Sequence, residues 1–282
     1  MKKRFLATAV MAATMAWGAI VNAGNQNIRW TVHNLSSASP IKDDLHWVND
    51  DTDQICIYCH TPHHAQPAQP LWNKVTPTQS FRMYTSSTTL SSAAKGAERP
   101  GPESLLCLSC HDGRTAINVL HNSSAGVDDG TGKKKLAFGG IDYDPTAPPE
   151  ISGIPMNIDT MTPTNIYRSN LGKTSDNRFA GDNLMDDHPI SFSYVSAQIE
   201  EGNTELHPIE HARSNGLRFF GPNRDQLECS SCHDPHMDYG MVPFGFSGGR
   251  KTTGSPTGNT SLTPFLVRDN AGSALCLACH NK

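Results

Sequence analysis

Apolar side chains are scarce in this 282-residue chain. Hydrophobic residues make up 37% and aromatic residues 7% of the sequence, whereas glycine (23) and proline (19) are abundant. Such a composition cannot bury a large core of side chains, and alone it would favour disorder. An ordered protein of this composition therefore needs another source of apolar interior.

Long hydrophobic runs are lacking after the N-terminus. Lys2, Lys3 and Arg4 precede an apolar run from Phe5 to Val21, and the small residue Ala23 follows it. A basic start, an apolar centre and a small-residue cleavage site indicate an export signal peptide over residues 1–23. The alternative is an N-terminal anchor helix, because the run approaches the length of a short membrane span.

An excess of positive charge is also lacking. The 27 Asp and Glu residues outnumber the 23 Lys and Arg residues, which gives a formal net charge of −4. Because no basic patch is present, the sequence does not indicate a nucleic-acid partner.

All eight cysteines lie in four C-x-x-C-H motifs. This is the attachment signature of c-type haem, in which two thiols form thioethers with the haem vinyl groups and the histidine becomes the proximal ligand of the iron. A zinc site or a redox disulfide would explain the cysteine pairs, but not the histidine after each pair. We therefore predict four haems c, which also supply the missing core. The thioether cysteines are Cys56, Cys59, Cys107, Cys110, Cys229, Cys232, Cys276 and Cys279, and the proximal ligands are His60, His111, His233 and His280.

The positions of the motifs suggest how the chain is organised. After the signal peptide we expect an N-terminal arm and first haem pair over 24–121, a loop-rich insertion that supplies distal histidines over 122–228, and a second haem pair over 229–282. The fold is predicted as mostly irregular coil, with short α-helices around the motifs and little β-structure. Helices are expected at Glu103–Cys110 and at Ile199–Arg213, and long surface loops over 126–135. His207 and His211 would share one face of the second helix.

Nine further histidines could supply the second axial ligand of each iron. His63 and His236 each follow a proximal histidine by three residues, so neither can reach the opposite face of its own haem. If they bind iron they bind another haem; the alternative is a hydrogen bond to a propionate or a carbonyl group. Methionine ligands stay open, although no methionine stands in a context that favours it. The nine are His33, His46, His63, His64, His121, His188, His207, His211 and His236.

The fourth motif lies close to the end of the chain. Only Asn281 and Lys282 follow His280, so the second ligand of this haem comes from upstream or from another molecule. A ligand donated in trans would join molecules head to tail, and such a contact builds an open filament unless it closes into a ring.

The sequence resembles the exported multihaem c-type cytochromes of metal-respiring bacteria, most closely the OmcE-type tetrahaem cytochromes that form extracellular nanowires. The resemblance implies His/His ligation, closely stacked haems and one axial histidine donated between subunits. It implies His33, His63, His188 and His236 as distal ligands, with His64 in reserve. The stretches that carry it are His33–Ser36, Cys59–His64, Pro70–Asn73, Asp187–Ile190 and Cys232–His236.

These features predict an electron carrier and not an enzyme, because two histidines on each iron leave no open site for a substrate. We expect copies of the chain to form a conductive extracellular or cell-surface filament. Electrons would come from periplasmic or outer-membrane cytochromes and pass to extracellular acceptors. The alternatives are a monomeric periplasmic shuttle and a multihaem oxyanion reductase.

Overall fold

The C-x-x-C-H motifs coincide with short helical turns. The computed structural model describes residues 26–41, 51–63, 71–112, 117–128, 130, 132–136, 171, 183–202, 204–240, 242–244, 251–253 and 255–282, so the expected signal peptide lies outside it. The first motif begins with the 3₁₀-helix η3 (Cys56–Tyr58) and the second ends α2 (Pro102–His111). The third forms α5 (Cys229–Cys232), and the fourth overlaps α6 (Ala274–Leu277).

A local hydrogen bond closes the turn in three of the motifs. The histidine N–H donates to the carbonyl of the first cysteine, over 2.8 Å in the first motif, 3.1 Å in the third and 2.9 Å in the fourth. This bond spans four residues, as in an α-helix, and holds the two thiols of a motif on one turn. In the second motif the turn is part of a longer helix, which begins with Pro102 at a position where a missing N–H is not needed.

The other elements are small. The helices are η2 (Ile28–Trp30), α1 (Ser92–Lys95), α3 (Tyr194–Glu200), α4 (Ile209–Ser214), η6 (Thr260–Leu262) and η7 (Ala271–Ser273). The strands are β1 (Val119–Leu120), β2 (Val127–Asp128), β3 (Lys134–Lys135), β4 (Phe192–Ser193), β5 (Gln226–Leu227), β6 (Val242–Phe244) and β7 (Lys251–Thr253). All described strand pairs are antiparallel, in the orders β1-β3-β2, β4-β5 and β6-β7.

Two of the expected elements differ in the structure. The helix expected at Glu103–Cys110 is present as α2, but the one expected at Ile199–Arg213 is wrong. It is divided into α3 and α4, because Gly202 adopts a left-handed conformation (φ 65°) and Pro208 is extended (φ −53°, ψ 142°). His207 therefore lies before α4 and does not share a helix face with His211.

Part of the stretch expected as surface loops, 126–135, forms a small antiparallel sheet. Strands β2 and β3 lie there and pair with register Val127↔Lys135, and β1 adds a third strand. The turn between β2 and β3 contains Gly130 and Gly132, both at positive φ, which glycine adopts without the strain that other residues incur.

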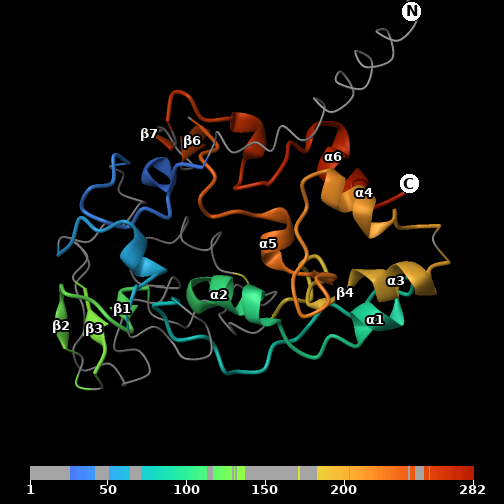
Figure 1. Cartoon of the computed structure of the whole chain (residues 1–282), viewed down its shortest axis with the longest axis horizontal. Coiled ribbons are helices and arrows are strands. Elements are labelled where there is room, and N and C mark those ends of the chain that lie inside the picture. Colours follow the sequence, from blue (N-terminus) through green and yellow to red (C-terminus); the bar gives the residue numbers. More distant parts are fainter. Residues whose placement is uncertain are drawn as a thin grey trace, which may run out of the picture.

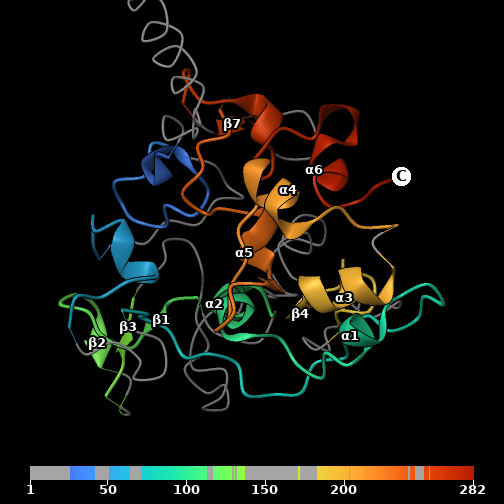
Figure 2. The same ribbon diagram turned by 45° about the vertical axis from the view of Figure 1, so that its right-hand side comes forward.

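The buried side chains form several small clusters. The largest surrounds Tyr194 and Phe219, includes Cys279, and joins α1, α3, β4 and α4. Helices α1 and α3 of this cluster lie side by side in both views (Figures 1 and 2). A second cluster contains Ile57 and Tyr58 of the first motif, and a third contains Leu105 and Leu108 of α2. Helix α2 packs against α5 near the centre (Figure 1). The apolar clusters thus lie beside the motifs.

Asn73 connects the first motif to the segment after β1. Its side chain is fully buried; Nδ2 donates to the carbonyls of Ile57 (2.6 Å) and Asn122 (2.7 Å), and Oδ1 accepts from the Asn122 N–H (2.7 Å). Asn73→Ala leaves three backbone groups without partners, so we expect the free energy of unfolding to fall by about 3 kcal/mol. Guanidinium denaturation followed by far-UV circular dichroism measures the change.

The exposed turn residue Asn223 provides the control for this prediction. Asn223→Ala should change the free energy of unfolding by no more than about 0.5 kcal/mol. Equal stabilities for the two variants would show that Asn73 does not hold the first motif.

Candidate haem-binding site

The eight motif cysteines are all free thiols. Burial raises the pKa of Cys59 and of Cys232 to about 12, and neighbouring thiols raise both further. These two thiols therefore stay protonated near neutral pH.

Thiols of successive motifs approach one another. Cys59 of the first motif and Cys110 of the second pack against the same apolar cluster. Cys107 of the second motif and Cys229 of the third lie close enough for each to shift the pKa of the other. Cys279 of the fourth motif likewise lies close enough to raise the pKa of Cys232 of the third. The four motifs therefore adjoin in chain order.

Three histidine pairs face each other across nearly equal gaps. Each pair combines a motif histidine with one of the histidines expected as distal ligands. The ring centres are 6.0 Å apart for His111 and His33, 6.3 Å for His60 and His236, and 6.3 Å for His280 and His188. The ring planes meet at 83°, 12° and 66° respectively.

These separations fit a metal ion between the two rings. A metal–imidazole nitrogen bond is about 2.1 Å long and a ring nitrogen lies about 1.1 Å from its ring centre, so two imidazoles on opposite sides of one metal have centres about 6.4 Å apart. By contrast, the rings of His207 and His211 are in direct contact at 4.2 Å. The three facing pairs thus have the spacing that axial ligation of an iron requires.

The pKa values of two motif histidines are lowered, whereas that of His236 is raised. Burial lowers the pKa of His60 and of His280, and the facing His236 or His188 lowers each further. Imidazole binds metals in its neutral form, which the two lowered values favour.

Hydrogen bonds fix several of these rings through one nitrogen. Nδ1 of His188 donates to the Pro189 carbonyl over 2.8 Å, and Nδ1 of His233 donates to the Pro264 carbonyl over 2.9 Å. Metal-binding histidines in proteins are oriented in this way, with Nε2 turned to the metal.

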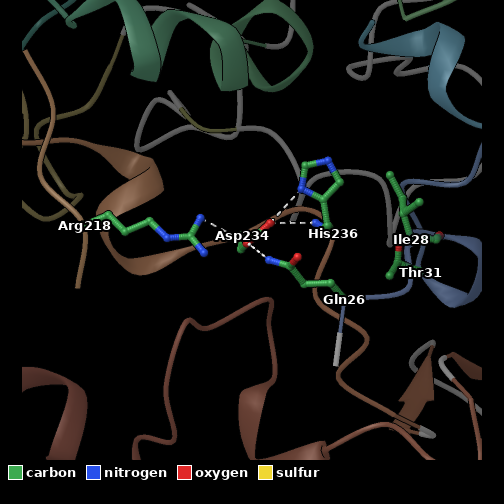
Figure 3. A network of polar contacts seen from close by, with 6 residues as sticks. All are labelled: Gln26, Ile28, Thr31, Arg218, Asp234 and His236. Carbon is green, nitrogen blue, oxygen red and sulfur yellow. Dashed lines mark hydrogen bonds and ion pairs between the residues drawn. The ribbon is translucent and has the colours of Figure 1, made fainter. Parts of the chain in front are cut away.

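His236 is held instead by a carboxylate, within the network shown in Figure 3. Oδ1 of the buried Asp234 accepts from Nδ1 of His236 over 2.8 Å and from its backbone N–H over 3.0 Å. The other oxygen, Oδ2, accepts from Gln26 over 2.9 Å and lies 3.2 Å from the Arg218 guanidinium. The bond to His236 lowers the pKa of Asp234 to about 2 and raises that of His236.

The fourth expected ligand pair is not assembled. His63 is exposed, and its backbone carbonyl accepts from Thr61 (2.8 Å) and Asn122 (3.0 Å). Within the described ranges no histidine ring is paired with His63 or with the motif residue His233. His46 and the reserve ligand His64 lie outside those ranges.

The sequence did not indicate two buried charged residues beside the motifs. Lys74 is fully buried and donates to the carbonyls of Ile117 (3.0 Å) and Val119 (3.1 Å). Burial raises the pKa of the nearby Cys59 and Cys110 thiols, and the charge of Lys74 opposes part of this rise. Only the tertiary fold reveals this residue, because a single lysine carries no motif.

Glu228 is the second buried charged residue. It is 1% exposed, caps α5, and accepts hydrogen bonds from Ser104 of α2 and from Ser191 (2.9 Å). Burial raises the pKa of this carboxyl group. It thereby ties the second motif to the third.

Searches of the remaining structure and of known proteins add no further site. Among the residues described, no group of three or more His, Cys, Asp or Glu side chains could hold a metal ion, and no helix is long and apolar enough to cross a membrane. No protein-family model matches the chain, and no curated protein matches it significantly.

Gly101 provides a test of the contact between the second and third motifs. A Cβ added there would lie 2.1 Å from Glu228 Oε1. Gly101→Ala must therefore displace the Glu228 side chain, and we expect a loss of about 1–3 kcal/mol of stability, measured as a lower denaturant midpoint.

A double-mutant cycle separates this clash from a general effect on α2. In a Glu228→Ala background the Gly101→Ala change should lose most of its cost, because the clashing carboxylate is gone. An equal cost in both backgrounds would rule out the clash as its cause.

Proposed function

We propose that this chain is an electron-transfer protein that binds four c-type haems, one at each motif. The observation that carries the proposal is the set of three facing histidine pairs, whose ring centres are 6.0–6.3 Å apart. In each pair, one ring belongs to a C-x-x-C-H motif and the other to a distant segment of the chain. This spacing supports axial ligation of iron by two histidines, although the ring of His33 lies closer to Phe265 (4.5 Å) and that of His60 closer to Trp72 (5.6 Å).

The residues that would hold the haems follow from these pairs. The thioethers would form at the two cysteines of each motif. The axial pairs would be His60 with His236, His111 with His33, and His280 with His188. No described histidine is paired with His233, so its haem would need a second ligand from elsewhere. Bound haem supplies a reversible one-electron iron couple and an apolar body for the interior.

The contacts between motifs support a path for electrons. Motif one adjoins motif two through Cys59 and Cys110, and motif two adjoins motif three at Cys107 and Cys229. Motifs three and four approach at Cys232 and Cys279. Haems attached to adjoining thiols would lie close together, in chain order.

The incomplete fourth pair supports assembly between copies. His63 follows His60 by three residues, and His233 precedes His236 by three residues. His60 and His236 are paired with each other, which leaves His63 and His233. Both His63 and His233 are exposed. We assign His63 of one copy to His233 of the next, with His64 as the reserve donor. A ligand shared in this way joins copies head to tail and favours an open filament.

The proposed filament would act outside the cell, where it receives electrons from periplasmic or outer-membrane cytochromes and passes them to extracellular acceptors. The predicted signal peptide over residues 1–23 supports export. A monomeric periplasmic shuttle would have the same motifs, and the exposed, unpaired His63 favours the filament over it. A multihaem oxyanion reductase needs an open iron, and the three facing pairs argue against one at those motifs.

The first prediction concerns ligation. The purified protein should carry four haems and show only low-spin ferric signals by electron paramagnetic resonance, apart from any haem that lacks its partner copy. His188→Ala removes one axial ligand, so one additional haem per chain should become high-spin. The matched variant His211→Ala should leave the spectrum unchanged. A wild-type protein without covalent haem would refute the proposed function.

The second prediction concerns assembly. His63→Ala should abolish filaments in negative-stain images and leave one haem per chain without its second ligand, while the chain stays folded. The neighbouring substitution His64→Ala is the matched control and should assemble like wild type. Filaments that persist in His63→Ala, or a wild-type protein that stays monomeric at high concentration, would contradict the assignment.

A further inference from the structure

The ring of His236 has a different partner from those of two other expected ligands. The rings of His188 and His233 each donate to a neutral backbone carbonyl. Nδ1 of His236 bonds instead to the Asp234 carboxylate, over 2.8 Å. Two ligands with the same imidazole chemistry can therefore differ in how strongly they donate electrons.

We propose that Asp234 is a positioning residue that lowers the reduction potential of the haem at the first motif, acting through His236. The inference rests on the proposed function, because it requires that His236 face His60 across an iron. A carboxylate that accepts the Nδ1 proton fixes the ring and makes the other nitrogen more basic. A more basic ligand and a nearby negative charge both stabilise ferric over ferrous iron.

The carboxylate is well fixed for this role. Asp234 is 3% exposed, and four polar contacts orient it, from Gln26, Arg218, the His236 ring and the His236 backbone (Figure 3). Because Oδ1 is engaged by both groups of His236 and Oδ2 by the other two residues, rotation of the carboxylate would break all of these contacts. The hydrogen bond to the ring therefore persists.

The opposing charge of Arg218 weakens the effect without cancelling it. Its guanidinium lies 3.2 Å from Oδ2, but its side chain is 54% exposed. Charges in contact with water are screened, whereas a buried carboxylate is screened much less. The Asp234 charge therefore dominates near His236, and the first haem is held at a lower potential than its two imidazole ligands alone would give it.

Asp234→Asn tests the inference in the full-length holoprotein. Asparagine keeps the size of the side chain and removes its charge. Spectroelectrochemical titration should show that one of the four midpoint potentials rises by about 59 mV. For a one-electron couple this corresponds to a tenfold change in the reduction equilibrium constant. The low-spin resonance of one haem should shift with it, because that signal depends on the basicity of the ligand.

Arg218→Gln should move the same midpoint downward, since it removes the opposing positive charge. The exposure of Arg218 makes this variant tolerable to the fold, so it tests the inference even if Asp234→Asn does not fold. Asp225→Asn is the matched control, because the Asp225 carboxylate accepts a hydrogen bond from Ser193 over 2.5 Å and no described histidine bonds to it. All four midpoints should stay unchanged in this control.

The haem content of the purified protein distinguishes a failure of the proposed function from a failure of the inference about Asp234. A wild-type chain without four covalent haems would overturn the proposed function itself. Four haems with unchanged midpoints in Asp234→Asn would overturn only the inference about Asp234. The same holds if Asp234→Asn and Arg218→Gln shift a midpoint in the same direction, because a structural disturbance and not charge would then be the cause.

Discussion

The gap between facing imidazole rings is the constraint on which the rest of the structure depends. In each pair, rings from segments that are far apart in the sequence lie with their centres 6.0–6.3 Å apart. At this distance the rings themselves contribute little contact energy. An iron bonded to both rings would turn each pair into a cross-link, and metal binding would then contribute directly to folding. The small, separate apolar clusters need such links, since none of them connects all four motifs.

Buried polar residues fix the positions of the motif turns and of His236 through hydrogen bonds. Asn73 bonds to the turn of the first motif, Glu228 caps the third, and Asp234 holds His236. Each is buried and bonds to several backbone or side-chain groups at once. In a protein with few aliphatic residues, hydrogen bonds of this kind fix positions that side-chain packing would fix elsewhere.

Local patterns could be predicted from the sequence. Contacts between segments far apart in the sequence could not. The motifs follow from residue spacing and helix α2 from the local sequence, whereas the choice of four distal histidines rested on the family resemblance. The pairing of His60 with His236 depends on how distant segments fold together, so spacing alone left it open. The helix expected at Ile199–Arg213 failed because Gly202 and Pro208 interrupt it, and the hairpin of β2 and β3 depends on glycine turns within a polar stretch. Lys74 carries no sequence signal, because only the fold reveals that it is buried.

The same surroundings explain how four haems with one type of ligand could differ. If every iron had two histidines, ligand identity could not set a gradient of potential along the path. The remaining influences are second-layer hydrogen bonds and buried charge. The described residues supply both unevenly: the buried ammonium group of Lys74 lies beside motifs one and two, and the buried carboxyl group of Glu228 lies between motifs two and three. A directional path for electrons would then depend on these polar residues more than on the histidines proposed to bind the iron.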